Sequence, residues 1–380
     1  MVECKRIISG CQDVLKRAVA GDRLSRDEGV LLFEQGGLAE LGLAADAKCR
    51  RLHPERYRTY VIDRNINYTN ICASGCRFCA FFRSPGDPEG YVLSTEEVLQ
   101  KISEAVDLGA TQILMQGGLN PDLRIEFFEH LFNAIKKRFS VQIHSLSAPE
   151  ICYIAKVSGL DVDSTIRRLI DSGLDSLPGG GAEILSDRVR AQISPHKAGT
   201  SEWLSVMRSA AKAGLRATAT MMFGHIETVE ERVDHLLAIR NVQDETLRQA
   251  QGDIVGQDDI GGQGAVGVFT AFIPWTYQPG NTALGGNAVG GHDYLKTLAI
   301  SRIMLDNIPN LQASWVTQGA RVAQVALTFG ANDIGSTMIE ENVVAAAGVS
   351  FTLSEQELVD LIRNAGFEAA QRDTMYKLRE

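Results

Sequence analysis

Short apolar runs alternate with amphipathic segments along this chain from about residue 60 onward. The segment 94–108 has the helical pattern: Ser94 and Glu97 form a capping box, apolar residues recur on one face, and Gly109 follows as a stop signal. The run TQILMQGG that comes next is apolar and ends in glycines, which predicts a buried strand.

Eight runs of this kind predict strands, and helical patterns separate them. The predicted strands are 60–69, 111–118, 141–147, 174–180, 215–224, 268–275, 311–316 and 331–335. Strictly alternating strands and helices predict an α/β protein with a parallel sheet and helices outside it. Eight strands favour a closed (β/α)8 TIM-type barrel, with an open doubly wound sheet as the alternative. In both folds the chemistry lies at the carboxyl ends of the strands.

The domain organisation follows from where this alternation begins and ends. Residues 1–59 show no clear strand and predict an N-terminal helical cap, while residues 60–340 predict the barrel. The stretch 246–267 is rich in Gly, Gln and Asp and predicts a surface loop inserted in the barrel, with a functional lid as the alternative. Residues 341–380 predict a C-terminal helical segment packed on the barrel.

Composition narrows the class of protein. Of the 380 residues 44% are hydrophobic and 22% charged, which is ordinary for a globular enzyme. A net charge of −9 argues against nucleic-acid binding. No apolar run reaches about 18 residues and the N-terminal stretch has no secretory pattern, so we expect a cytoplasmic protein without a membrane span. Seven cysteines, an odd number, argue against a disulfide framework.

Three of these cysteines fall on one short segment. Cys72, Cys76 and Cys79 have the spacing C-x3-C-x2-C, and no fourth cysteine lies nearby. Three thiolates can bind three irons of a cubane cluster and leave the fourth iron open. A zinc site needs a fourth ligand, and a redox C-x-x-C pair leaves Cys72 without a role. The spacing therefore predicts a [4Fe–4S] cluster, with zinc and a redox pair as alternatives.

This spacing at the end of a first barrel strand resembles the radical S-adenosylmethionine (SAM) superfamily. The resemblance implies that SAM binds the open iron, and that one electron from a low-potential donor such as flavodoxin or ferredoxin yields a 5′-deoxyadenosyl radical. It also implies cofactor contacts, although Leu119 stands where the superfamily motif carries Glu. The implied cofactor residues are Phe78, Gln116, Gly117, Gly118 and Glu183.

Longer motifs, from about residue 20 to the C-terminus, resemble the dehypoxanthine futalosine cyclase family of the menaquinone (futalosine) pathway. They are DRNINYTNIC, HSLSAPEI, GLDSLPGGGAEILSDRVR, ISPHK, MMFGHIET and FIPWTYQPGNT. The resemblance implies hydrogen abstraction at the ribose C4′ of a small-molecule substrate, and ring closure onto its benzoate ring. Aminofutalosine synthase and the deazaflavin-synthase-like enzymes are the alternatives within the superfamily. A non-enzymatic electron carrier is disfavoured, because carriers close all four irons of the cluster.

This chemistry needs a base and a partner for the benzoate carboxylate. His144 at a strand end is the candidate base, because neutral imidazole accepts protons near pH 7. Tyr68 is a second catalytic candidate, and Glu150 and His225 compete for the same role. Basic residues after the GGGAE loop (residues 179–183) are the candidate carboxylate partners. These substrate-binding candidates are Arg188, Arg190 and His196, with Lys197 beside them.

Overall fold

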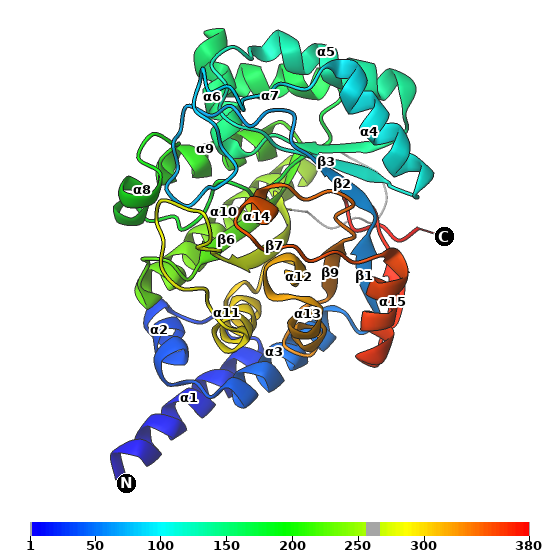
Figure 1. Cartoon of the computed structure of the whole chain (residues 1–380). Helices are drawn as coiled ribbons and strands as arrows, with labels where there is room; N and C mark the ends of the chain where they lie inside the picture. The colour runs from blue at the N-terminus through cyan, green and yellow to red at the C-terminus, as the bar shows by residue number, and fades with distance from the viewer. Residues whose placement is uncertain (1, 256–266, 380) are drawn as a thin grey trace.

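The chain folds around a curled sheet of parallel strands (Figure 1). The computed structural model describes the backbone of residues 2–255 and 267–379, and the side chains of residues 10–250 and 267–379. Seven parallel strands follow one another in sequence order in the main sheet. They are β2 (Asp63–Ile66), β3 (Gln112–Met115), β4 (Gln142–Ser145), β5 (Ser176–Leu177), β6 (Arg216–Phe223), β7 (Phe269–Thr276) and β8 (Asn310–Leu311).

A second sheet of three parallel strands continues the curl. Its order is β10 (Glu368–Gln371), β1 (Tyr57–Val61) and β9 (Asp333–Ser336). Gln312, just after β8, forms a parallel bridge with Asp333 of β9, and the Thr337 N–H donates to the Val61 carbonyl. Only Ile62 separates β1 from β2, so the strands follow one another around a common interior. The predicted α/β fold of barrel type is confirmed as a curled half-barrel, whose described strands form two sheets of seven and three strands instead of one sheet of eight.

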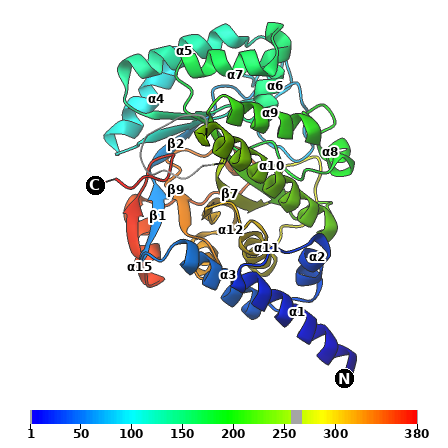
Figure 2. The same cartoon turned by 180° about the vertical axis from the view of Figure 1, so that it is seen from behind.

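Helices surround this sheet on the outside (Figures 1 and 2). The Ser94–Glu97 capping box is present at the start of α4, whose apolar face is buried against the sheet. The helices that follow the strands are α4 (Thr95–Asp107), α5 (Ile125–Arg138), α6 (Ala148–Ser158), α7 (Val162–Asp171), α8 (Asp187–Ile193), α9 (Thr200–Lys212), α10 (Val229–Val255), α11 (Gly291–Met304), α12 (Trp315–Gln318), α13 (Ala320–Ala326), α14 (Val343–Ala346) and α15 (Glu355–Asn364).

Three helices precede the first strand, as the lack of strand signals predicts. They are α1 (Val2–Ala20), α2 (Arg26–Gln35) and α3 (Leu38–Leu52). Helices α2 and α3 pack closely against the core: an added methyl group at Gly29 would meet Met304 of α11, and one at Gly42 would meet Phe329. Figure 1 shows α1 projecting from this end of the molecule. None of the helices in the described part of the chain is both long and apolar enough to cross a membrane.

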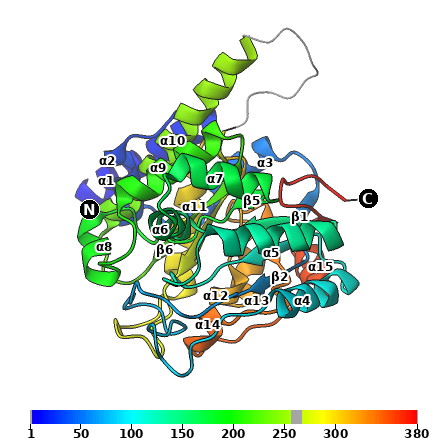
Figure 3. The ribbon, with the colours of Figure 1, turned by 90° about the horizontal axis from the view of Figure 1, so that it is seen from above.

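Three local predictions are wrong. The strand predicted at 311–316 ends at Leu311 in the structure, and helix α12 already begins at Trp315. The predicted loop 246–267 is helical up to Val255, where Figure 3 shows α10 extending from the body, and residues 256–266 lie outside the described part. The loop prediction took Gln together with Gly and Asp as loop residues, although Gln, Arg and Ala favour a helix. The predicted helical segment 341–380 also contains β10, which forms because the edge of β1 offers unpaired backbone groups.

Candidate active site

The interior of the curled sheet holds a cavity of about 390 Å³. Alternate residues of the strands point into it, as the two-residue period of a strand requires. Asn65 of β2, Leu114 of β3 and His144 of β4 are in register with one another and all three line the cavity. Thr218 and Thr220 of β6, and Ile273 and Trp275 of β7, line it from the other side.

The three-cysteine loop follows β2 and also lines this cavity. Cys72, Cys76 and Cys79 are free thiols, and burial raises the pKa of Cys76 to about 11. The Leu119 N–H donates to Cys72 Sγ at 3.2 Å, and the Ser74 hydroxyl lies 3.0 Å from Cys76 Sγ. Among the described residues no group of three His, Cys, Asp or Glu could hold a single metal ion. Three thiols that each bind a different iron do not need to lie close enough to share one metal ion, so the loop suits a cluster better than zinc.

The segment Gln116–Gly118 lies directly beside the cysteine loop. A methyl group added to Gly117 would lie 2.6 Å from the Tyr68 ring, and one added to Gly118 would lie 2.2 Å from the Ile71 carbonyl oxygen. Both positions therefore require glycine. The same segment leads to Leu119, whose N–H contacts Cys72. The structure thus brings the cluster motif and the predicted glycine motif together at one end of the cavity.

Glu150 holds this segment in place. Its Oε1 accepts from the Tyr68 hydroxyl at 2.6 Å and from the Gly117 N–H at 2.9 Å, while Oε2 accepts from the N–H and hydroxyl of Ser147. A carboxylate has about four acceptor sites, so Glu150 has none left for catalysis. Tyr68 is buried against Phe128 and is not among the residues that line the cavity. The structure thus places the predicted catalytic candidate Tyr68 beside Glu150 and behind the cavity lining.

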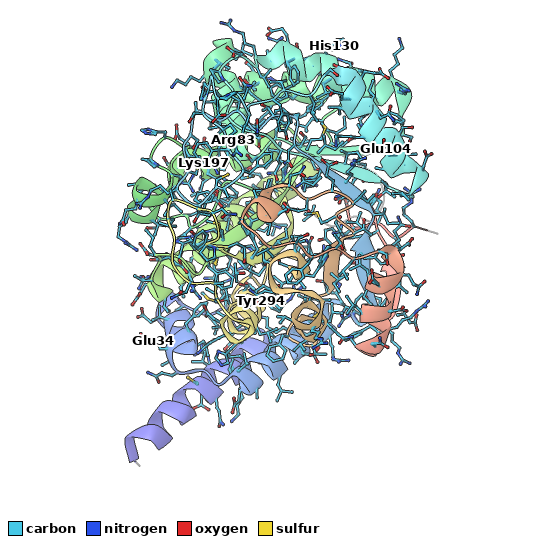
Figure 4. All side chains as sticks on the ribbon, in the orientation of Figure 1. Glu34, Arg83, Glu104, His130, Lys197 and Tyr294 are labelled. Atoms are coloured by element: carbon cyan, nitrogen blue, oxygen red, sulfur yellow. The ribbon has the colours of Figure 1, made fainter. Side chains whose placement is uncertain are left out.

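The GGGAE loop after β5 carries Glu183 into the cavity. Glu183 has a positive φ of 44°, and its Oε1 accepts from Lys197 Nζ at 2.7 Å. Lys197 Nζ also lies 5.4 Å from the centre of the Phe78 ring, so Glu183, Lys197 and Phe78 meet beside the cysteine loop. Burial opposes the charge of Lys197, but the attraction of Glu183 outweighs it and raises the pKa of Lys197. Figure 4 labels Lys197 toward the left of the view, on the side of the molecule away from Glu104.

The three predicted substrate-binding residues do not reach the cavity. Arg188 lies on the outer face of α8 and pairs with Glu231 at 2.6 Å, and His196 is exposed. Arg190 is buried, but its guanidinium donates to the backbone carbonyls of Gly181, Ala182 and Ala198. Two residues apart on a helix, the two arginines point in different directions. Arg190 therefore fixes the GGGAE loop, and the expectation of a carboxylate partner among these residues is corrected.

His144 does face the cavity. Its Nδ1 lies 2.6 Å from the Ser176 hydroxyl, and its Nε2 has no hydrogen-bond partner among the described residues. Burial, aided by the charge of Arg372, lowers the pKa of His144 to about 3. A group with that pKa is a weak base at pH 7, so the geometry favours a neutral hydrogen-bonding role over the predicted base.

Sequence reasoning did not single out Asn65, which also lines the cavity. A signal was present in the first strand. Asp63, Asn65 and Asn67 are polar and buried at every second position, whereas Arg64 between them is charged and only partly buried. In a barrel this period places all three on the interior face.

Comparisons with known proteins agree with this geometry. The family description "Radical SAM superfamily" matches residues 66–239, and "CofH/MqnC C-terminal region" matches residues 266–380. The X-ray structure of the FeFe-hydrogenase maturase HydG from Carboxydothermus hydrogenoformans has a TM-score of 0.72 at 16% identity, covering 98% of this chain and 82% of that one. At that identity the likeness shows the fold.

Three relatives are closer in sequence. The cyclic dehypoxanthine futalosine synthase of Halalkalibacterium halodurans is 46% identical, over 96% of this chain and 94% of the relative. The one of Streptomyces coelicolor is 43% identical, over 96% and 88%. The 5-amino-6-(D-ribitylamino)uracil–L-tyrosine 4-hydroxyphenyl transferase 1 of Methanosarcina barkeri is 40% identical, over 96% and 93%.

A parallel α/β barrel with a three-cysteine loop after its first interior strand defines a radical SAM enzyme, and superfamily membership implies a [4Fe–4S] cluster and SAM. Within that superfamily, the chain belongs to the family that contains the cyclic dehypoxanthine futalosine synthases.

Proposed function

We propose that this enzyme converts dehypoxanthine futalosine to cyclic dehypoxanthine futalosine in menaquinone biosynthesis. The observation that carries the proposal is identity of 46% and 43%, over 96% of the chain, to two synthases of that name. The hydroxyphenyl transferase is also similar, at 40% over the same share of the chain, and gives the second candidate function.

Cys72, Cys76 and Cys79 are proposed to bind three irons of the cluster. Their placement on one loop, with the Leu119 N–H donating to Cys72 Sγ, supports this assignment. When bound, the cluster and SAM supply one electron and the 5′-deoxyadenosyl group that removes a hydrogen atom from the substrate. A low-potential donor such as flavodoxin or ferredoxin is proposed to supply that electron.

The residues around the loop are proposed to hold SAM. Gln116, Gly117 and Gly118 line the cavity beside Cys72, and Glu183 and Phe78 line the same cavity. Glu150 and Arg190 keep these two segments in place through hydrogen bonds to side-chain and backbone groups. This rigidity fits a site in which a misplaced cofactor would lose the reaction geometry.

The deeper part of the cavity is proposed to hold the substrate and exclude water. Leu114, Ile273 and Trp275 give it apolar walls, which protect a reactive carbon radical from solvent. For the balance of the reaction, the substrate loses its C4′ hydrogen atom to the deoxyadenosyl group. After the new carbon–carbon bond forms, the ring must lose one proton, which would pass to solvent, and one electron to become aromatic again. That electron would be accepted by the oxidised cluster, when bound.

The test is an anaerobic assay with reconstituted enzyme, dithionite and SAM. One arm uses dehypoxanthine futalosine with deuterium at C4′, and the other uses 5-amino-6-(D-ribitylamino)uracil with L-tyrosine. We expect cyclised product, and deuterium in the 5′-deoxyadenosine, in the first arm alone. Product in the second arm instead would establish the transferase function. Unlabelled 5′-deoxyadenosine with no product in the first arm would contradict the proposal.

A further inference from the structure

The charged side chains that line the cavity all have hydrogen-bond partners within the described part of the protein. Lys197 is bound to Glu183, Arg372 to Asp333, and Asp63 to Gln112 and Ser336. Glu150 has four donors, and Glu341 accepts from backbone N–H groups of residues 343–345. A ligand in this cavity therefore meets no charged side chain that lacks a hydrogen-bond partner.

The polar groups that line the cavity and lack partners in the described structure are neutral, and they include Asn65, His144 and the hydroxyl of Tyr376. Asn65 is 5% exposed, and neither end of its amide has a hydrogen-bond partner among the described residues. Asn67, two residues further along the same face, differs: its Nδ2 donates to the Gln116 carbonyl, and its Oδ1 accepts from Asn342. His144 is in register with Asn65 across Leu114, and no described residue forms a hydrogen bond with its Nε2.

Buried polar groups without partners are rare, because each costs the free energy of losing water without regaining a hydrogen bond. In a binding site the partner is the ligand. The Asn65 amide offers a donor and an acceptor, and His144 offers only Nε2, which donates or accepts according to the tautomer because Nδ1 is bound to Ser176. A hydroxyl group can both donate and accept, so it suits either residue, whereas a carboxylate cannot donate and would leave the Asn65 oxygen unpaired.

We propose that Asn65 and His144 form a neutral subsite that binds hydroxyl groups of the substrate. That these hydroxyl groups are the ribose hydroxyls of dehypoxanthine futalosine rests on the proposed function. The subsite lies within the barrel, with the Ser176 hydroxyl fixing the imidazole ring from behind. The benzoate carboxylate then lies elsewhere in the cavity.

The first test needs no substrate and uses Asn65→Leu with Asn67→Leu as the matched control. A buried polar group without a hydrogen-bond partner destabilises the ligand-free protein, so Asn65→Leu should raise the unfolding temperature by about 1–3 °C. Asn67→Leu should lower it, because two hydrogen bonds are lost. Asn65→Ala serves if the leucine variant does not fold. If the Asn65 variants are destabilised as much as Asn67→Leu, Asn65 is a structural residue and the proposal is overturned.

The second test measures equilibrium binding of dehypoxanthine futalosine, its benzoate methyl ester and analogues that each lack one ribose hydroxyl. Asn65→Leu should bind the substrate and the ester about tenfold more weakly than the unmodified enzyme does. One deoxy analogue should show no further loss, since its partner is already absent. A loss that disappears with the ester instead would assign the subsite to the carboxylate and overturn the proposal. If the unmodified enzyme binds none of these compounds, the proposed function fails, and the unfolding comparison still decides whether Asn65 is a ligand-binding group.

Discussion

Two arginines on one short helix allow the stability contributed by buried hydrogen bonds to be compared with that of a surface ion pair. Arg188 and Arg190 are two residues apart on α8, yet the Arg188 side chain is 49% exposed whereas Arg190 is 3% exposed. Arg188 pairs with Glu231 at the surface. Arg190 donates to three backbone carbonyls that have no other donor in the described structure. We expect Arg190→Met and Arg188→Met to have very different consequences.

The size of the Arg190 effect follows from those three carbonyls. A buried acceptor left without a partner costs about 1–3 kcal/mol, and part of that cost is recovered by local relaxation. The Arg190→Met change should therefore reduce the free energy of unfolding by about 3–6 kcal/mol. Exposed ion pairs contribute little, since water and salt screen them, so Arg188→Met should leave stability almost unchanged.

Urea denaturation followed by circular dichroism measures both variants against the unmodified protein. For a slope of about 3 kcal/mol/M, the Arg190→Met midpoint should fall by about 1–2 M. Loosening of the GGGAE loop should also weaken SAM binding in the folded variant. Equal midpoints for the two variants would refute the reasoning, because they would mean that the buried hydrogen bonds contribute no more than the surface pair.

Three further outcomes can be measured on single variants. Reconstituted enzyme should contain about four irons per chain, and Cys72→Ala should lose iron and form no 5′-deoxyadenosine, whereas Cys152→Ala should retain both. Glu150→Gln leaves one backbone N–H without an acceptor, so it should raise the KM for SAM about tenfold while the iron content stays the same. Tyr68→Phe should raise the KM by a smaller factor. An unchanged KM in both variants would contradict the positioning role. The pKa of His144 is about 3 when folded and near 6.5 when unfolded, so the unfolded state binds the extra proton and stability falls as pH drops from 6.5 toward 3. His144→Gln should remove about 2 kcal/mol of the loss between pH 7 and pH 5, measured by urea unfolding at both values.

Much of the fold could be predicted from local signals. The strand–helix alternation placed the interior strands, and the Ser94–Glu97 capping box is present in the structure. The cysteine spacing predicted a cluster loop because its three ligands lie within eight residues of one another. These features depend on neighbours in the sequence, so periodicity, capping residues and spacing suffice to predict them.

These local signals do not determine the direction in which a side chain points. Basic residues after the GGGAE loop predicted a carboxylate partner, but whether an arginine reaches the cavity depends on the helix face that packs against the barrel. Strand β10 was missed for a similar reason, because it forms by pairing with β1, about 310 residues away.

The sequence by itself determined the class of chemistry, through the C-x3-C-x2-C loop and the alternation of strands and helices that carries it. The tertiary structure decided which polar groups are already satisfied and which still need a partner. Glu150 binds Tyr68 and Gly117, which are far away in the sequence, and Arg190 binds carbonyls of the loops before and after its own helix. Asn65 and His144 line the cavity with polar atoms that have no partner in the described structure. Hydrogen-bond satisfaction depends on atoms brought together by folding, and for that reason no pattern along the chain could separate the positioning residues from those that await a substrate.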